Sequence, residues 1–339
     1  MVSGGTAVQV GLLVASVAGL WLGARFLVDS VVRLARRFGL SELVIGLTVV
    51  AAGTSTPELV VSADAALKGL GAIAVGNVVG SNIYNLAFIL GVVSLLRVVP
   101  IERSLVHRDG LVLVASTFVG AGVLFDLTSS RVEGGVLLVL FVVYTAYLLR
   151  TSVGDGTGTV TPSSGTASDA SDASEAEPAV PTGLTERVSF QGRDALLLLV
   201  GLAVVLVSGD LMVSTASTLA RGAGVSESVI GGTIVAAGTS TPEFAVSLVA
   251  IRRGRLGVSV GNVVGSNVFN MLGILGVASL VRPLTFEAVL LESVAWLLVV
   301  AVLVVGALWT GRQLSRPEGG LFAASEVGRW VLGLVGLVG

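Results

Sequence analysis

The sequence predicts an all-α polytopic membrane protein of about ten transmembrane helices, built as two inverted five-helix repeats. Two observations support this fold class. The 339 residues are 53% hydrophobic and only 12% charged, whereas soluble domains carry about 25% charged residues. The same polar motifs also occur once in each half of the chain. Most of the length is therefore expected to face lipid or other helices.

The internal repeat keeps its spacing without a gap. Residues 53–58 and 238–243 both read Gly-Thr-Ser-Thr-Pro-Glu, and residues 76–82 and 261–267 both read Gly-Asn-Val-Val-Gly-Ser-Asn. The offset is 185 positions at both motifs (243 − 58 and 261 − 76). In the surrounding stretch roughly 30 of about 50 positions are identical, which is typical of a duplicated structural unit.

Ten apolar stretches are candidates for membrane spans. They occupy residues 6–31, 43–66, 72–96, 111–127, 132–150, 194–217, 228–250, 257–281, 287–309 and 320–338. The fourth and the tenth are short for a span. Because each half contains an odd number of spans, the second repeat starts on the opposite side of the membrane from the first, which inverts it.

The chain divides into three parts. Residues 1–150 are expected to form the first five-helix repeat and residues 193–339 the second. Segment 151–192 is acidic and rich in Gly, Ser, Thr, Ala and Pro. It is too polar to bury a core, so we predict a disordered acidic linker that tethers the halves.

Basic residues set the expected orientation. The odd-numbered loops carry two or three arginines each, whereas each even-numbered loop carries one basic residue. The positive-inside rule therefore places the odd loops and the linker in the cytoplasm and both termini outside. We expect a multi-pass protein of the cell membrane. No basic residue precedes the first apolar stretch, so a cleavable signal peptide is not expected.

Composition also argues against several function classes. The chain has no Cys, and its single His, His107, lies in a charged loop, so neither a thiolate nor a histidine metal site is expected. No nucleotide-binding motif occurs, so we expect no cofactor and no nucleic-acid partner. A membrane enzyme would need a nucleophile–base pair or a metal site. A channel usually builds its filter from symmetric subunits, whereas a fused inverted repeat favours alternating access.

Two carboxylates lie in the middle of predicted helices, where a carboxylate is costly unless it faces a cavity or a partner. Glu58 and Glu243 follow Pro57 and Pro242, which should break or kink their helices. Each break is expected to free backbone carbonyls near residues 51–55 and 236–240. Hydroxyl oxygens lie close by, on Thr54, Ser55, Thr239 and Ser240. Two other hydroxyls, on Thr56 and Thr241, are expected to bond the carbonyl one turn back.

The next helix of each half supplies a second polar wall. Ser81 and Asn85 are four positions apart, as are Ser266 and Asn270, and this spacing puts both side chains on one helical face. For four further amides, both ion contact and interhelical hydrogen bonding stay open: Asn77, Asn82, Asn262 and Asn267. Carboxylate, amide and hydroxyl oxygens suit hard cations such as Ca²⁺ and Na⁺. Two ionised carboxylates balance one Ca²⁺ or two Na⁺, so the two ions would compete for one site.

The repeated segments 53–58, 76–82, 238–243 and 261–267 resemble the two α-repeats of the prokaryotic sodium/calcium exchangers, in the cation/calcium antiporter superfamily. The resemblance covers both halves. It implies exchange of Na⁺ for Ca²⁺ by alternating access, with both ions bound near the midplane between the repeats. It also implies that the first and sixth helices slide against the other eight. A functional monomer in the lipid bilayer is expected, with Ca²⁺ and Na⁺ as substrates.

The resemblance further implies the ion ligands. Glu58 and Glu243 would ligate both ions. Matching by position, the remaining ligands would be Thr54, Ser55, Ser81, Asn85, Thr239, Ser240, Ser266 and Asn270, with the backbone carbonyls of Ala51 and Ala236. Potassium-dependent relatives carry Asp where this chain has Asn270, so K⁺ co-transport is not expected. Proton-coupled relatives carry Asn-Ala before the glutamate, which this chain lacks. This favours Na⁺, and antiport of H⁺ against Ca²⁺ or another divalent cation stays as the alternative.

Two charged pairs occur at helical spacing. Arg25 and Asp29 near the end of the first helix are expected to form a local ion pair, and so are Asp64 and Lys68 at the outer end of the second.

Overall fold

The structure is a computed structural model, which describes residues 5–97, 99–100, 105–155, 192–224, 236–311 and 313–334. The predicted linker therefore lies outside the described residues from 156 to 191. The start of the predicted seventh span, within residues 225–235, also lies outside them.

The first half consists of helices with two short strands, and η marks a π-helical segment. In order they are α1 (Thr6–Phe38), α2 (Glu42–Ile45), η1 (Gly46–Val50), α3 (Ala51–Thr54), α4 (Thr56–Leu67), α5 (Gly71–Ile83), η2 (Tyr84–Ile89), α6 (Leu90–Leu96), β1 (Val99–Pro100), η3 (Leu105–Gly110), α7 (Leu111–Leu124), β2 (Thr128–Ser129) and α8 (Arg131–Asp155).

The second half repeats this order in the part that the structure describes. Its elements are α9 (Gly192–Gly222), α11 (Ala236–Thr239), α12 (Thr241–Arg252), α13 (Leu256–Val268), η5 (Phe269–Ile274), α14 (Leu275–Val281), β3 (Leu284–Thr285), α15 (Leu290–Gly311), β4 (Gln313–Leu314) and α16 (Arg316–Leu334). The π-helical segments η2 and η5 are 185 positions apart at both ends, so the offset of the sequence repeat is also the offset of the fold.

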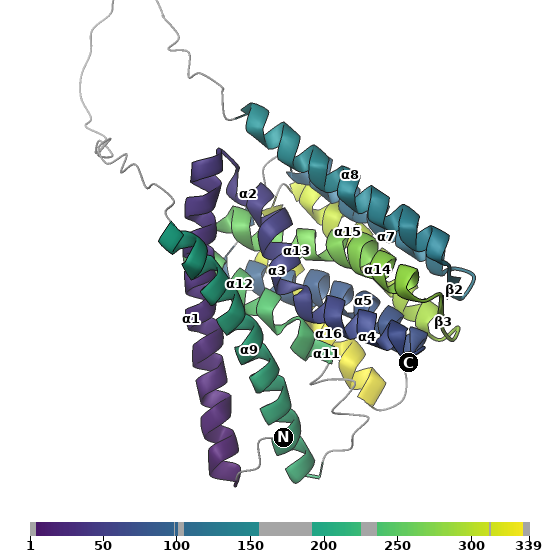
Figure 1. Cartoon of the computed structure of the whole chain (residues 1–339), viewed down its shortest axis with the longest axis horizontal. Coiled ribbons are helices and arrows are strands. Elements are labelled where there is room, and N and C mark those ends of the chain that lie inside the picture. The colour runs from purple at the N-terminus through teal and green to yellow at the C-terminus, as the bar shows by residue number, and fades with distance from the viewer. Residues whose placement is uncertain are drawn as a thin grey trace, which may run out of the picture.

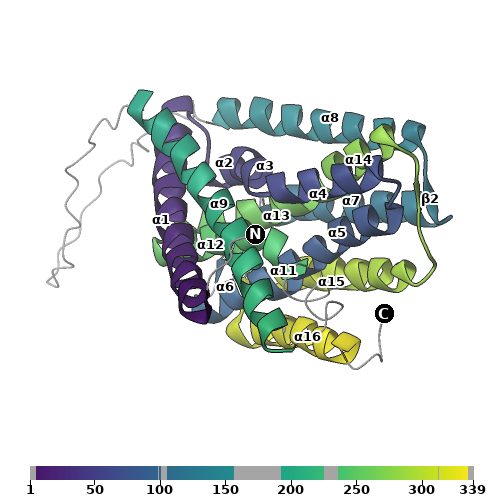
Figure 2. The ribbon, with the colours of Figure 1, turned by 60° about the horizontal axis from the view of Figure 1, so that its bottom comes forward.

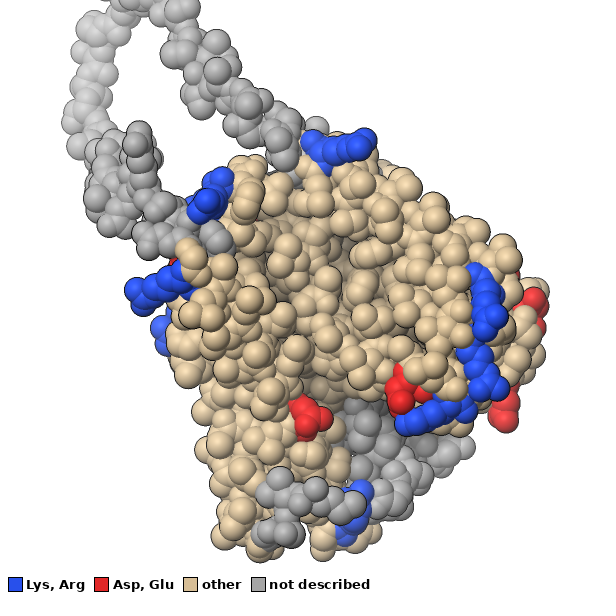
Figure 3. Space-filling view, viewed as in Figure 1, with Lys and Arg blue, Asp and Glu red and all other residues tan. Residues whose placement is uncertain are grey.

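Several of the described helices have the lengths that membrane spans need. Among the described residues, six helical segments are long and apolar enough to cross a membrane, and the bent pair α2–α4 makes a seventh. The predicted fourth span corresponds to α7, which has only 14 residues. The space-filling view shows Lys, Arg, Asp and Glu mostly near the margins, with broad uncharged surface between them (Figure 3). The protein is an all-helical multi-pass membrane protein.

Two short antiparallel ladders join the halves. Strand β1 pairs with β4, with Val99 opposite Leu314, and β2 pairs with β3, with Ser129 opposite Leu284. Adding 185 to Val99 gives Leu284, and adding 185 to Ser129 gives Leu314. Each ladder is therefore the image of the other under exchange of the halves, as a pseudo-twofold axis requires.

Helices α1 and α9 form a unit of their own along one flank of the molecule (Figures 1 and 2). Glycine permits their close approach: a Cβ on Gly23 would lie 2.9 Å from the backbone oxygen of Gly201 and 2.9 Å from the backbone nitrogen of Val205. A small apolar core joins α1 and α9 to α2 and α12. In the part of the chain that the structure describes, the larger core between the other helices contains no residue of α1 or α9.

The charged pairs show where local spacing misleads. Asp64 and Lys68 form the predicted pair at 2.6 Å, with both side chains exposed. The prediction for Asp29 is wrong, because its carboxylate pairs with Arg253 at the end of α12. Arg25 lies over the ring of Trp21, with 4.8 Å between the guanidinium carbon and the ring centroid. Asp29 therefore links α1 to α12 and does not form an ion pair within its own helix.

Candidate ion-binding site

Each half contains a helix that is broken at the Gly-Thr-Ser-Thr-Pro-Glu motif. In the first half, the segments 42–54 and 56–67 meet at 48°, with Ser55 at the break. In the second half, Ser240 separates α11 from α12 in the same way. Because proline has no N–H and clashes with the preceding turn, Pro57 and Pro242 end one helix and begin the next. The break places Glu58 and Glu243 in the first turn of the following helix.

The two carboxylates are fully buried and are joined across the repeats. The Ser55 hydroxyl donates to Glu243 Oε1 at 2.8 Å, and the Ser240 hydroxyl donates to Glu58 Oε1 at 2.8 Å. The Ser81 hydroxyl also donates to Glu58 Oε1, at 3.4 Å. Each glutamate is thus held by a serine from the opposite half, so the carboxylates belong to one polar centre.

One asparagine joins each broken helix to the helix that follows it in the chain. Asn77 donates to the Glu58 carbonyl at 3.2 Å and to the Ser62 hydroxyl at 2.9 Å. Asn262 makes the equivalent bonds to the carbonyl of Glu243 and the hydroxyl of Ser247, at 3.2 and 3.0 Å. For these asparagines, the hydrogen-bonding role left open by the sequence is the one observed.

Asn85 and Asn270 lie in the π-helical segments η2 and η5. Both are fully buried. A π-helical turn is wider than an α-helical one and often occurs at functional sites. The sequence predicts the shared face of these asparagines with Ser81 and Ser266, but it does not predict the π-helical turns.

Several oxygens of this centre are buried without a hydrogen-bond partner. Among the predicted ligands these oxygens are Glu58 Oε2, Glu243 Oε2, Asn85 Oδ1, Asn270 Oδ1, Thr239 Oγ1 and Ser266 Oγ. A buried acceptor without a donor costs about 1–3 kcal/mol. Their concentration here fits a site that cations complete, because a cation satisfies several oxygens at once. No group of three or more His, Cys, Asp or Glu occurs among the described residues, so amide and hydroxyl oxygens would have to supply the remaining ligands.

The remaining predicted ligands are placed as follows. Thr54 donates to Asn262 Oδ1 at 3.0 Å. The carbonyl of Ala51 is not left free by the break, since it accepts from the Ser55 N–H at 3.0 Å and from the Thr54 hydroxyl at 3.4 Å. Ala236 begins α11. As predicted, the Thr56 hydroxyl bonds the Gly53 carbonyl at 2.8 Å and the Thr241 hydroxyl bonds the Ala237 carbonyl at 3.3 Å.

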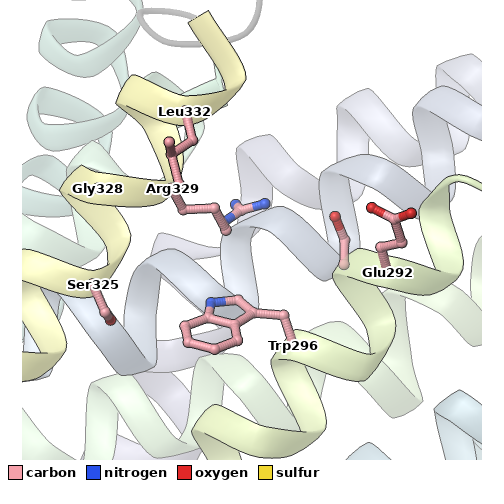
Figure 4. Close-up of a pocket in the computed structure, with 7 residues that line it drawn as sticks. Glu292, Trp296, Ser325, Gly328, Arg329 and Leu332 are labelled. Carbon is pink, nitrogen blue, oxygen red and sulfur yellow. The ribbon is translucent and has the colours of Figure 1, made fainter. Parts of the chain in front are cut away.

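A separate cavity of about 380 Å³ lies between α15 and α16, where Trp296 and Arg329 extend into the space between the helices (Figure 4). Its lining residues include none of the predicted ion ligands. Arg329 is already paired with Glu326 at 3.0 Å. This cavity is therefore distinct from the carboxylate centre.

Comparison with known proteins gives one consistent result. The chain matches the sodium/calcium exchanger protein family over residues 8–150 and 194–325. It is 34% identical over 324 residues to CaxA of Alkalimonas amylolytica, covering 94% of this chain and 95% of that protein. It is 31% identical over 321 residues to the sodium/calcium exchanger MaX1 of Methanosarcina acetivorans, covering 88% and 90%.

A solved structure shares the fold as well as the sequence. The sodium-calcium exchanger NCX_Mj, soaked with Na⁺ and no Ca²⁺, superposes with a TM-score of 0.78 and 31% identity, over 98% of this chain and 100% of that one. The match extends over both halves, so neither repeat is left unaccounted for. The chain is therefore a member of the sodium/calcium exchanger family, a family of membrane transporters.

Proposed function

We propose that this protein is a secondary active antiporter that exchanges Na⁺ for Ca²⁺ by alternating access. The ions would bind between the repeats, at Glu58 and Glu243. The other ligands would be the side chains of Thr54, Ser55, Ser81, Asn85, Thr239, Ser240, Ser266 and Asn270, with the backbone carbonyls of Ala51 and Ala236.

The observation that carries this proposal is the set of buried, unpartnered oxygens around two cross-bridged carboxylates. Glu58 and Glu243 together would balance one Ca²⁺ or two Na⁺. The described residues of the centre include no third carboxylate. The site could therefore not balance the charge of one Ca²⁺ and two Na⁺ at the same time, so binding of one kind of ion would displace the other. The named exchangers among the relatives and solved structures support the same pair of ions.

The arrangement of α1 and α9 supports alternating access. These helices pack on each other through glycine and share only a small core with the rest of the protein. Such a two-helix unit could slide past the bundle without disturbing the larger core. We also propose a functional monomer, because the carboxylate centre is made within one chain.

We further propose that both termini lie outside and that the linker predicted at residues 151–192 is a cytoplasmic tether between repeats 1–150 and 193–339. Because α8 continues to Asp155 and α9 begins at Gly192, the disorder is proposed only for the residues between these helices. The ladders are consistent with this topology. With ten spans, β1 follows the third and β4 the ninth, so both would lie on the cytoplasmic side. Strands β2 and β3 follow the fourth and the eighth and would meet on the outer side, as their pairing requires.

The coupling ion is tested with Ca²⁺ tracer uptake into proteoliposomes. We expect uptake when the lumen is loaded with Na⁺ and the bath is Na⁺-free, and little uptake when K⁺ replaces luminal Na⁺. A proton gradient of either direction, without Na⁺, should not drive uptake. Uptake driven by protons alone would instead assign the protein to H⁺/Ca²⁺ antiport and overturn the proposed coupling.

A further inference from the structure

The hydrogen bonds of the carboxylate centre are only partly symmetric. Since equivalent residues are 185 positions apart, each bond between two residues of the repeated motifs has an equivalent bond that the matching residues could make. Both members of the pair Ser55–Glu243 and Ser240–Glu58 are made, at the same distance of 2.8 Å. Other bonds of the centre are made without their equivalents. Three of them lie between the halves: Thr54 to Asn262, Asn270 to Asn82, and Asn82 to the carbonyl of Asn267. A further one, Ser81 to Glu58, lies within the first half.

The atoms that would make the equivalent bonds are the ones left unpaired. The unpartnered buried atoms of the centre include Thr239 Oγ1, Asn85 Nδ2, Asn267 Oδ1 and Ser266 Oγ. Thr239 is the equivalent of Thr54, Ser266 of Ser81, Asn85 of Asn270, and Asn267 of Asn82. Within the carboxylate centre, the observed bonds are therefore one of two equivalent hydrogen-bond sets.

Asn82 takes part in two of the hydrogen bonds that the observed set contains. Its Nδ2 donates to the backbone carbonyl of Asn267 at 3.3 Å, and its Oδ1 accepts from Asn270 Nδ2 at 3.0 Å. A backbone carbonyl can only accept, so the first bond fixes the orientation of the Asn82 amide. The second bond then uses an N–H of Asn270 and leaves Asn270 Oδ1 buried and available to a cation.

Asn267 makes no equivalent hydrogen bond to Asn85. Its Nδ2 donates to the carbonyl of Val263, one turn back in its own helix, at 2.7 Å. Its Oδ1 is unpaired, and both polar atoms of the Asn85 side chain are unpaired as well. If the Asn267 side chain turned toward the other half as Asn82 does, its Oδ1 would accept from Asn85 Nδ2. This bond would fix the Asn85 amide and leave Asn85 Oδ1 available to a cation.

We propose that Asn82 and Asn267 are positioning residues, each of which orients one ligand amide in one of the two access states. In the state observed here Asn82 holds Asn270; in the oppositely facing state Asn267 holds Asn85. Exchange of the two halves about the pseudo-twofold axis converts one access state into the other. A bond that the first half makes to the second in the observed state is therefore made by the second half to the first in the oppositely facing state. This inference rests on the proposed antiport and adds residues that bind no ion themselves.

The test measures the half-saturating Ca²⁺ concentration separately from the two membrane faces, in vesicles of each orientation. Asn82→Ala is expected to raise the half-saturating Ca²⁺ concentration on one face by about three- to tenfold, the effect of one lost hydrogen bond. On the other face this concentration should change by less than about twofold. Asn267→Ala is expected to do the same on the opposite face. Ser55→Ala is the matched control, because its bond belongs to a symmetric pair and should matter equally on both faces.

Equal shifts on both faces for Asn82→Ala and Asn267→Ala, or no shift for either, would overturn the positioning role. If Asn82→Ala does not accumulate in the membrane, Asn82→Ser replaces it, since serine is too short to reach both Asn267 and Asn270. The wild-type protein separates the two proposals. Absence of Na⁺-driven Ca²⁺ uptake in the wild type is a failure of the proposed function, whereas normal wild-type exchange with symmetric mutant effects is a failure of this inference alone.

Discussion

The Ser55 hydroxyl of one repeat donates a hydrogen bond to the buried carboxylate of Glu243 in the other, at 2.8 Å. Ser240 returns the equivalent bond to Glu58. This exchange makes the two glutamates parts of a single centre, even though they are 185 residues apart in the chain. It also leaves one oxygen of each carboxylate without a protein partner.

The serine bonds predict a specific loss of affinity. A hydrogen bond to a charged group contributes about 1.5–3 kcal/mol, so Ser55→Ala and Ser240→Ala should each weaken the apparent Ca²⁺ affinity by about tenfold or more. The measurement is the Ca²⁺ dependence of tracer uptake. Thr56→Ala is the control, since its hydroxyl bonds the Gly53 carbonyl in its own helix. An equal loss in Thr56→Ala would argue for a general effect of helix perturbation.

Ca²⁺ should stabilise the folded protein. A ligand at about 100 times its dissociation constant stabilises the state that binds it by about 2.7 kcal/mol. We therefore expect the melting temperature of the purified protein to rise with Ca²⁺ and to fall again on chelation. The rise should vanish in the double variant Glu58→Gln/Glu243→Gln. It should persist in Asp64→Asn, whose carboxylate is exposed on the same helix as Glu58. A rise that persists in the double variant would place the stabilising site elsewhere.

The contact of α1 with α9 predicts a steric effect. In Gly23→Ala the new methyl group would lie 2.9 Å from backbone atoms of Gly201 and Val205, so the helices must separate, at a cost of about 1–3 kcal/mol. We expect a lower melting temperature and slower exchange. Gly11→Ala in the same helix meets nothing within 4 Å and should be neutral or slightly stabilising. Equal stability of the two variants would contradict the close approach.

The absence of cysteine makes the topology directly testable. Lys68→Cys lies in the even loop after α4, and Arg150→Cys lies five residues before the end of α8. A membrane-impermeant maleimide applied to intact cells should label the first and spare the second, with the unmodified protein as the unlabelled control. Reversed labelling would invert the proposed orientation.

The sequence was most informative where the same motif occurs in both halves. Glu58 and Glu243 stood out because a buried carboxylate is costly and the same costly pattern occurs twice. Bonds within one helical turn were also predictable, as for Asp64 with Lys68 and for Thr56 with its preceding turn.

Contacts between distant segments were not predictable in this way. Local spacing paired Asp29 with Arg25, whereas the fold brings Arg253 to Asp29 from 224 positions away. The π-helical turns at Asn85 and Asn270 do not follow from the four-residue spacing that predicted their helical face. The asymmetry between Asn82 and Asn267 is invisible in a sequence where both halves read alike.

The central claim is that the two cross-bridged glutamates form the ion site, and Na⁺-dependent Ca²⁺ uptake by Glu58→Gln and Glu243→Gln proteoliposomes tests it most directly. Glutamine keeps the size of the side chain and removes the charge that the cations balance. We predict that uptake is lost in each single variant and retained in Asp64→Asn. Full uptake in either glutamine variant would contradict the account.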